Sequence, residues 1–259
     1  MSFFQQFTPE QWLLGLTTAI FVGFSKTGIP GAGVVVVPLM AQAFGARLSI
    51  GTTVILLIMG DVFAVYWYRR HAKLEHIWKL VPWVVVGMIL GGFALYMLGE
   101  KQGKDIMNPI IGGMVLLMIA LSLLRKRLGD RLTPHSPTGV KLTGAAAGFS
   151  TTVANAGGPV MAIYLQGTGL LKEQMIGTNG WYFFIFNVAK VPLYIALTLL
   201  APKDPVWNSH TITFTAIVFP LVVCGAYLGK WCLPKINQKL FDSLVLILAT
   251  VASIRLILQ

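Results

Sequence analysis

The stretch Gly23–Met40, GFSKTGIPGAGVVVVPLM, places glycines, proline and small hydroxyl residues within an apolar region. A related stretch, Gly148–Leu165, GFSTTVANAGGPVMAIYL, does the same in the second half of the chain. Irregular backbone at membrane depth is tolerated only where protein shields it or where it lines a cavity. Paired broken segments in matching positions of two halves are typical of a transporter binding site, so we expect the site at these two stretches.

The composition indicates a polytopic membrane protein. Hydrophobic residues make up 56% of the 259 residues and charged residues only 11%, whereas a soluble globular domain carries about 25% charged residues. The net charge of +11 does not indicate nucleic-acid binding, because the lysines and arginines fall in short loops between apolar segments. No His/Cys cluster has the spacing of metal ligands, so we expect neither a metal nor another cofactor.

The apolar segments predict an all-α fold. Some are long enough to cross about 30 Å of hydrocarbon as helices. These predicted spans are 50–68, 77–99, 107–124, 176–200, 211–232 and 241–258. The others have about 10–14 residues, a length that is more often re-entrant than spanning, and they form two pairs that the glycine-rich stretches join. These short segments are 11–24, 33–46, 141–150 and 158–171.

The two halves of the chain repeat one another. Gly23-Phe24-Ser25 recurs as Gly148-Phe149-Ser150, and Ile50-Gly51-Thr52 recurs as Ile176-Gly177-Thr178. Several matches in the same order predict an internal duplication. The further pairs are Gly33 with Gly158, Asp61 with Asn187, and the P-x4-G-x3-G set Pro82, Gly87 and Gly91 with Pro220, Gly225 and Gly229.

The distribution of positive charge favours one of two topologies. If each glycine-rich pair is one continuous span, the two sides of the membrane hold 10 and 7 of the loop lysines and arginines. If each pair enters and returns on the same side, the split is 13 to 4, and the minority is Arg47, Lys101, Lys104 and Lys203. The second topology is favoured because basic residues concentrate on the cytoplasmic side.

In this topology each half is a hairpin plus three spans, so the two halves are inverted relative to one another. We predict a first membrane repeat at 1–127, a cytoplasmic linker at 128–138 and a second membrane repeat at 139–259. Both termini would lie outside, and the two hairpin tips would approach the midplane from opposite faces. Inverted repeats whose broken helices meet at a midplane site are a recurring architecture of secondary transporters.

Both hairpin tips predict a site for a small anion. A helix that restarts after a tip presents unsatisfied N–H groups and about +0.5 of a charge, and hydroxyl and amide groups donate to oxyanions. Alternatively, the glycines permit tight helix packing and the hydroxyls bond to the backbone. The candidate substrate-binding residues are Ser25, Lys26, Thr27, Gly31, Gly33, Ser150, Thr151, Thr152, Asn155, Gly157, Gly158 and Lys190.

Ionisable residues within the predicted membrane sections are costly, so they mark pathways or pair with one another. Lys26 and Lys190 would supply positive potential to an anion. Asp61 would neutralise one of these lysines or carry a coupling proton. Asp61 and its counterpart Asn187 are therefore the coupling candidates. The alternative is a buried Lys–Asp pair that only fixes helix packing.

The sequences GIPGAGVVVVPLM and I-G-T-T, with N-A-G-G-P and I-G-T-N in the second half, resemble the TauE/SafE sulfite-exporter family over essentially the whole chain. The resemblance implies a permease of the bacterial or archaeal inner membrane for sulfite or related anions such as sulfonates and thiosulfate. Members are usually described with more full spans than we predict, and the two hairpins make the difference. The resemblance points to the tips around Gly31–Gly33 and Asn155–Gly158.

We predict a secondary transporter that exports sulfite or a related small sulfur-containing oxyanion by rocking of two inverted halves around a midplane site. The alternative on the same scaffold is an anion channel or an importer of organosulfonates or thiosulfate. An enzyme is not expected, because the spans contain no Ser/His pair, no His/Asp cluster and no H-E-x-x-H motif. The expected partners are the small anion and the lipid bilayer.

Overall fold

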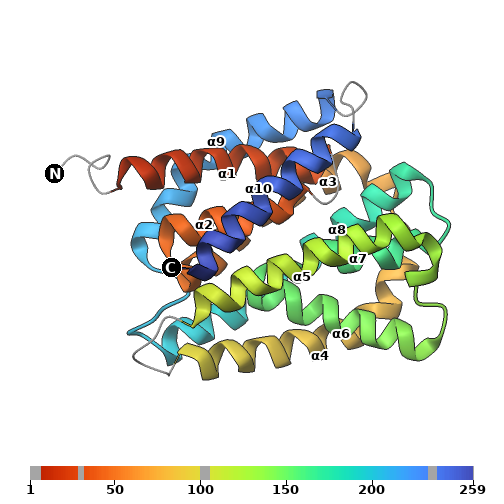
Figure 1. Cartoon of the computed structure of the whole chain (residues 1–259), viewed down its shortest axis with the longest axis horizontal. Helices are drawn as coiled ribbons and strands as arrows, with labels where there is room; N and C mark the ends of the chain where they lie inside the picture. Colours follow the sequence, from red (N-terminus) through yellow and green to blue (C-terminus); the bar gives the residue numbers. More distant parts are fainter. Residues whose placement is uncertain (1–6, 29–31, 100–105, 233–237, 259) are drawn as a thin grey trace.

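A computed structural model describes residues 7–28, 32–99, 106–232 and 238–258 as a bundle of helices (Figure 1). No strand occurs within these ranges, which confirms the predicted all-α fold. The helices are α1 (Pro9–Thr27), α2 (Val36–Phe44), α3 (Ala46–Tyr68), α4 (Leu74–Gly99), α5 (Met107–Leu128), α6 (Pro137–Ala154), α7 (Gly158–Gln166), α8 (Lys172–Leu200), α9 (Ser209–Cys232) and α10 (Gln238–Leu258). Short 3₁₀ helices precede α2 (η2, Ala32–Val35), follow α3 (η3, Arg69–His71) and follow α5 (η4, Gly129–Leu132).

Five helices of the described ranges are long and apolar enough to cross a membrane. They are α3 with its extension η3, α4, α5, α8 and α9. These five correspond to five of the predicted spans and confirm a multi-pass membrane protein. The remaining predicted span, 241–258, falls on α10, a helix of 21 residues that does not belong to this group.

Each predicted hairpin has one long and one short arm. The long arms, α1 and α6, have 19 and 18 residues, which corresponds to about 27–29 Å. The short arms, α2 and α7, have 9 residues each, or about 14 Å. The short arms cannot cross about 30 Å of hydrocarbon, as a re-entrant topology requires.

The long arms extend beyond the segments 11–24 and 141–150 that hydropathy predicted. α1 begins earlier because Thr8 and Gln11 form a capping box, in which each side chain bonds to the backbone N–H of the other residue. α6 begins directly after Ser136, whose hydroxyl caps the helix. A capped helix includes a polar first turn, which an apolar pattern does not reveal.

The first turn of α1 and the last turn of α10 lie at the same end of the molecule (Figure 1). α1 and α2 run in opposite directions, and the last turn of α5 lies at the other end together with the first turns of α4, α6 and α8 (Figure 1). This grouping brings together the ends that carry most of the basic residues. That this end faces the cytoplasm remains a prediction from the charge distribution.

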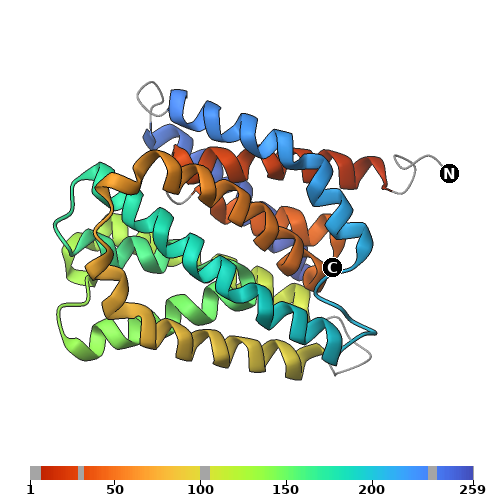
Figure 2. The same ribbon diagram turned by 180° about the vertical axis from the view of Figure 1, so that it is seen from behind.

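The most extensive packing joins each half of the chain to the other half. α1 packs along α9, and α6 packs along α4. α5 packs against α10, and α3 packs against α8, the two long helices that cross the view in Figure 2. The predicted linker 128–138 falls between α5 and the first turn of α6, but the stretches before and after it are interleaved in space.

Glycines allow α1 and α9, and likewise α4 and α6, to touch backbone to backbone. A Cβ atom at Gly23 would overlap the backbone of α9, and one at Gly225 would overlap the backbone of α1. A Cβ atom at Gly148 would overlap α4, and one at Gly87 would overlap α6. Gly23 and Gly148 are counterparts in the repeat, as are Gly225 and Gly87. We call these two contacts the glycine seams. Each seam pairs a hairpin arm of one half with a long helix of the other half, and equivalent glycines make the contact in both.

We predict that Gly148→Ala lowers the midpoint of thermal unfolding in detergent. The new methyl group overlaps the carbonyl oxygen of Val84, and overpacking of this kind costs about 1–3 kcal/mol. The matched control is Gly113→Ala on α5, where nothing lies within 4 Å of the added Cβ. The control should be neutral or stabilising, since alanine is favoured over glycine in a helix by up to about 1 kcal/mol. Equal midpoints for the two variants would contradict a backbone-to-backbone seam.

Candidate functional site

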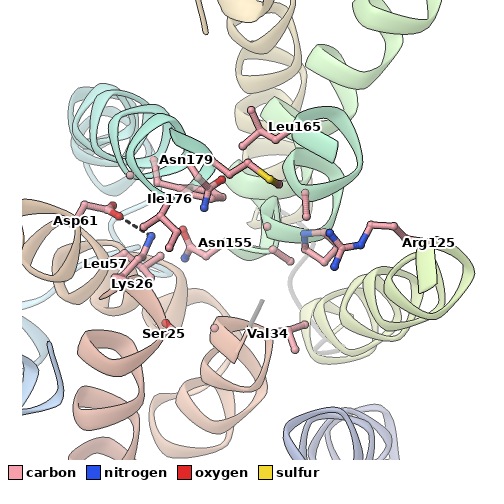
Figure 3. A pocket seen from close by; sticks show the side chains of 18 residues that line it. Ser25, Lys26, Val34, Leu57, Asp61, Arg125, Asn155, Leu165, Ile176 and Asn179 are labelled. Atoms are coloured by element: carbon pink, nitrogen blue, oxygen red, sulfur yellow. Dashed lines mark ion pairs between the residues drawn. The ribbon is translucent and has the colours of Figure 1, made fainter. Parts of the chain in front are cut away.

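A cavity of about 120 Å³ is lined by residues of both glycine-rich stretches. Its walls come from the end of α1, η2, α3, the end of α5, the start of α7 and the first half of α8 (Figure 3). The space admits a small oxyanion or several water molecules, since one water needs about 10–15 Å³. Its polar lining residues are Ser25, Lys26, Asp61, Arg125, Asn155 and Asn179, and apolar residues such as Leu57, Ile176 and Phe183 complete the wall.

Asp61 on α3 is the centre of a buried polar cluster. Its Oδ1 atom lies 2.7 Å from Nζ of Lys26, which comes from the last turn of α1. Its Oδ2 atom accepts a hydrogen bond of 2.6 Å from Nδ2 of Asn187 on α8. The Lys26 ammonium also lies 4.3 Å from the centre of the Phe183 ring. The carboxylate is fully buried, and its charge is tolerated there because both oxygens are compensated.

The contact between Asp61 and Asn187 joins equivalent positions of the two halves. The repeat pattern pairs these residues in sequence, and the structure places them within hydrogen-bond distance. The prediction that Asp61 pairs with a lysine also holds, with Lys26 as the partner.

Lys190 on α8 faces the second tip and is not part of the cavity wall. Its Nζ atom donates to the Thr151 carbonyl at 2.9 Å, to the Thr151 hydroxyl at 3.1 Å and to Oδ1 of Asn155 at 2.7 Å. Asn155 has a left-handed backbone with φ of 50°, and its Nδ2 donates to the carbonyl of Ile50 at 2.8 Å. All three donor positions of the ammonium are used, so Lys190 fixes Asn155 in place.

In each half, a tyrosine at the equivalent position of the repeat forms a hydrogen bond to the end of the long hairpin arm. The Tyr194 hydroxyl donates to the Thr152 carbonyl at 2.7 Å, and the Tyr68 hydroxyl donates to the Thr27 carbonyl at 3.4 Å. Both pairs are counterparts in the repeat. The end of each long arm is therefore anchored to the long helix that follows its hairpin.

Several of the residues predicted to bind substrate line the cavity: Ser25, Lys26, Gly33, Asn155 and Gly158. The Ser25 hydroxyl donates at 3.0 Å to a carbonyl of its own helix. Gly158 is the first residue of α7, and nothing lies within 4 Å of a Cβ atom added to it. The face of Gly158 is therefore open to the cavity.

The other predicted residues lie away from the cavity wall. The hydroxyls of Ser150 and Thr152 donate to carbonyls of their own helix at 3.3 and 2.8 Å, and the Thr27 hydroxyl donates to the carbonyl of Ala226 on α9 at 2.7 Å. Gly157 packs against the second tip, where an added Cβ would lie 3.0 Å from the Thr151 side chain. Gly31 lies outside the described residues.

Two polar residues of the cavity wall, Arg125 and Asn179, were not among the sequence-based candidates. Arg125 counted only as a basic residue at the end of a span, yet it reaches into the cavity from the last turn of α5 (Figure 3). Asn179 is the last residue of the I-G-T-N motif and lines the cavity from α8. A signal for Asn179 existed, because asparagine stands there where the first-half motif has Thr53. No comparable signal marked Arg125.

A sequence profile described as "Sulfite exporter TauE/SafE" matches residues 15–256, nearly the whole chain. The protein belongs to the TauE/SafE sulfite exporter family. No curated protein and no solved structure matches the chain. Membership in the TauE/SafE family implies a membrane transporter of the sulfite-exporter type, and it confirms the resemblance seen in the glycine-rich motifs.

We predict that the effects of mutating Lys26 and Asp61 on the free energy of unfolding are strongly coupled, because the two side chains form a buried ion pair. Lys26→Met leaves a buried carboxylate without its cation, and Asp61→Asn leaves the ammonium without its anion, so each should destabilise by about 3–5 kcal/mol. The double variant should lose much less than the sum, because no uncompensated charge remains. Unfolding of the purified protein in detergent measures all three variants.

The control cycle uses Arg255 and Glu10, an ion pair of 3.7 Å in which each side chain is 60% exposed. Such a pair should show a coupling of about 0–1 kcal/mol. Strictly additive effects of Lys26→Met and Asp61→Asn would mean that the buried pair does not stabilise the fold.

Proposed function

We propose that this TauE/SafE protein is a secondary transporter that exports sulfite or a related small sulfur-containing oxyanion across the cell inner membrane. The substrate would bind in the cavity between the two tips, near the membrane midplane. The observation that carries the proposal is the lining of this cavity, where the cations Lys26 and Arg125 and the amides of Asn155 and Asn179 face one space. Oxyanions require donors of these kinds.

The balance of charge in the cavity supports an anionic substrate. Asp61 compensates Lys26 at 2.7 Å, so Arg125 adds a positive charge that no other lining residue of the described ranges balances. Clefts lined by one sign of charge and closed by apolar walls concentrate ions of the opposite sign. The excess charge here favours a small anion.

Asp61 is our candidate for coupling transport to protons, with Asn187 as its hydrogen-bonding partner. Protonation of the carboxylate would end its ion pair with Lys26 and leave the ammonium free to attract the substrate. The Lys26 side chain is 12% exposed, and both residues line the cavity. Protonation of Asp61 would therefore strengthen anion binding beside Lys26, and anion binding would strengthen protonation of Asp61.

Alternating access would move bodies that each contain parts of both halves. The glycine seams join α1 to α9 and α6 to α4, and closely packed helix pairs move as units. We therefore expect one hairpin to move together with a helix of the opposite half. This replaces the simpler expectation that the first half of the chain rocks against the second.

The first test of the proposed function is sulfite efflux from proteoliposomes, with and without an imposed pH gradient. We expect saturable efflux that the gradient accelerates and that thiosulfate inhibits more strongly than chloride does. Asp61→Asn should abolish the acceleration, whereas Glu10→Gln, an exposed carboxylate at the start of α1, should retain it. Efflux that does not depend on the pH gradient and does not saturate would favour an anion channel. Net uptake of sulfite would favour an importer.

A second test fills the cavity. Gly158→Leu adds a side chain where nothing lies within 4 Å of the new Cβ, so it should fold normally and occupy the space of the substrate. Sulfite flux should fall by about tenfold or more, as expected when a ligand is displaced from its bound position. Gly113→Leu, which also has open space around its Cβ but lies on α5 away from the cavity, is the control. Normal flux in Gly158→Leu would exclude the cavity as the transport site.

A further inference from the structure

Arg125 carries a positive charge that the described part of the chain leaves available to a ligand. It is half-buried in the last turn of α5 and lines the cavity. Within residues 7–28, 32–99, 106–232 and 238–258 its guanidinium makes no hydrogen bond and no ion pair. Asp242 on α10 attracts it electrostatically, but the Asp242 carboxylate is bound by Nζ of Lys126 at 2.9 Å.

The other cationic side chains near the tips are already engaged. Lys26 is paired with Asp61 at 2.7 Å, and Lys190 uses its ammonium on Thr151 and Asn155. Figure 3 shows Arg125 entering the cavity from the side opposite to Lys26 and Asp61. An anion that enters the cavity therefore meets a paired lysine on one wall and an unpaired arginine on the other.

Asn179 adds a neutral donor to the same space. Its side chain lines the cavity from α8, and its amide makes no hydrogen bond to any residue that the structure describes. An amide group left without partners in a partly buried site costs free energy until a ligand or water satisfies it. Arg125 and Asn179 are thus the lining residues with spare donors.

We propose that Arg125, with the amide of Asn179, is the primary anion-binding site of the cavity, and that it recognises the oxygen face of a sulfite or sulfonate group. This inference rests on the proposed function and names the residues that hold the substrate. The guanidinium is a planar fork of N–H donors that matches two oxygens of one oxyanion, a geometry that the point charge of a lysine does not offer. Lys26 binds the anion only after Asp61 releases it.

The position of Arg125 suits export. The last turn of α5 lies at the end of the molecule where α4, α6 and α8 begin (Figure 1), and this end carries most of the basic loop residues. Basic loops mark the cytoplasmic side. An anion that arrives from the cytoplasm would therefore meet Arg125 before it reaches the Lys26–Asp61 pair.

The test measures anion binding to the purified full-length protein by isothermal titration calorimetry. The probes are sodium sulfite, sodium thiosulfate and sodium methanesulfonate, with sodium chloride as a reference. Arg125→Gln should weaken binding of the oxyanion at least about tenfold, since a hydrogen bond to a charged group is removed. Arg125→Lys should recover part of the loss, because it restores the charge without the fork.

Arg127→Gln is the matched control, because Arg127 is exposed two residues further along the same helix. It removes the same charge near the same end and should bind the anion like the wild type. Asn179→Ala should weaken binding less than Arg125→Gln does, and its unfolding midpoint without ligand should match the wild type. This second variant keeps the test valid if Arg125→Gln folds poorly.

The outcomes separate this inference from the proposed function. Wild-type affinity for sulfite in both Arg125→Gln and Asn179→Ala would overturn the inference and leave the proposed function standing. Binding of methanesulfonate or thiosulfate but not sulfite, with the same loss in Arg125→Gln, would support the inference and change the substrate. A wild-type protein that binds none of the three oxyanions would overturn both.

Discussion

The close contact of helix backbones at the two glycine seams is the constraint on which the rest of the structure depends. Helices in a bilayer gain no hydrophobic stabilisation from one another, so their association requires close packing and hydrogen bonds. At the first seam, the Thr27 hydroxyl donates across the interface to the Ala226 carbonyl at 2.7 Å. At the second, a Cβ on Gly91 would lie 2.9 Å from Cβ of Thr152. The seams thereby fix the end of α1, which carries Lys26, and the end of α6, directly before Asn155, so that both residues line the cavity.

The buried charges follow from that placement. A charged side chain within the membrane requires a compensating partner. In each half a lysine makes such a contact, but the lysine lies on a different helix in each half. In the first half Lys26, on the hairpin, reaches Asp61 on the long helix α3. In the second half Lys190, on the long helix α8, reaches Thr151 and Asn155 on the hairpin. Each lysine therefore connects the end of a hairpin arm to the long helix that follows the hairpin, α3 or α8. Both halves thus connect a hairpin to a long helix through a lysine, but the partners of the lysine differ.

Local pattern was enough to predict most of the fold. Hydropathy placed the spans on α3, α4, α5, α8 and α9, because that signal depends on residues close together in sequence. The pairing of Asp61 with Asn187 came from matching short motifs between the two halves. The extent of α1 and α6 was underestimated, since capping by Thr8 and Ser136 lets a helix include polar residues. The cavity was predicted only in part.

Which hydroxyl faces the cavity depends on how each helix is rotated about its axis, and tertiary packing decides that rotation. Thr27 and Ser25 are two residues apart, yet only Ser25 lines the cavity. Arg125 could not be found from its neighbours in sequence. Its place in the cavity wall depends on α5 packing beside α6 and α7, and no local motif records that contact.

The interleaving of the halves has a consequence for biosynthesis. Thr27 and its partner across the first seam, Ala226, are 199 residues apart. At a synthesis rate of about 5–20 residues per second, α1 waits about 10–40 s for α9 to emerge. During that interval its glycine face lacks the α9 backbone that covers it in the folded protein, whereas α4 and α6 are much closer together in the sequence. α1 is thus made well before the helix that becomes its main neighbour, and it must stay in the membrane until α9 follows.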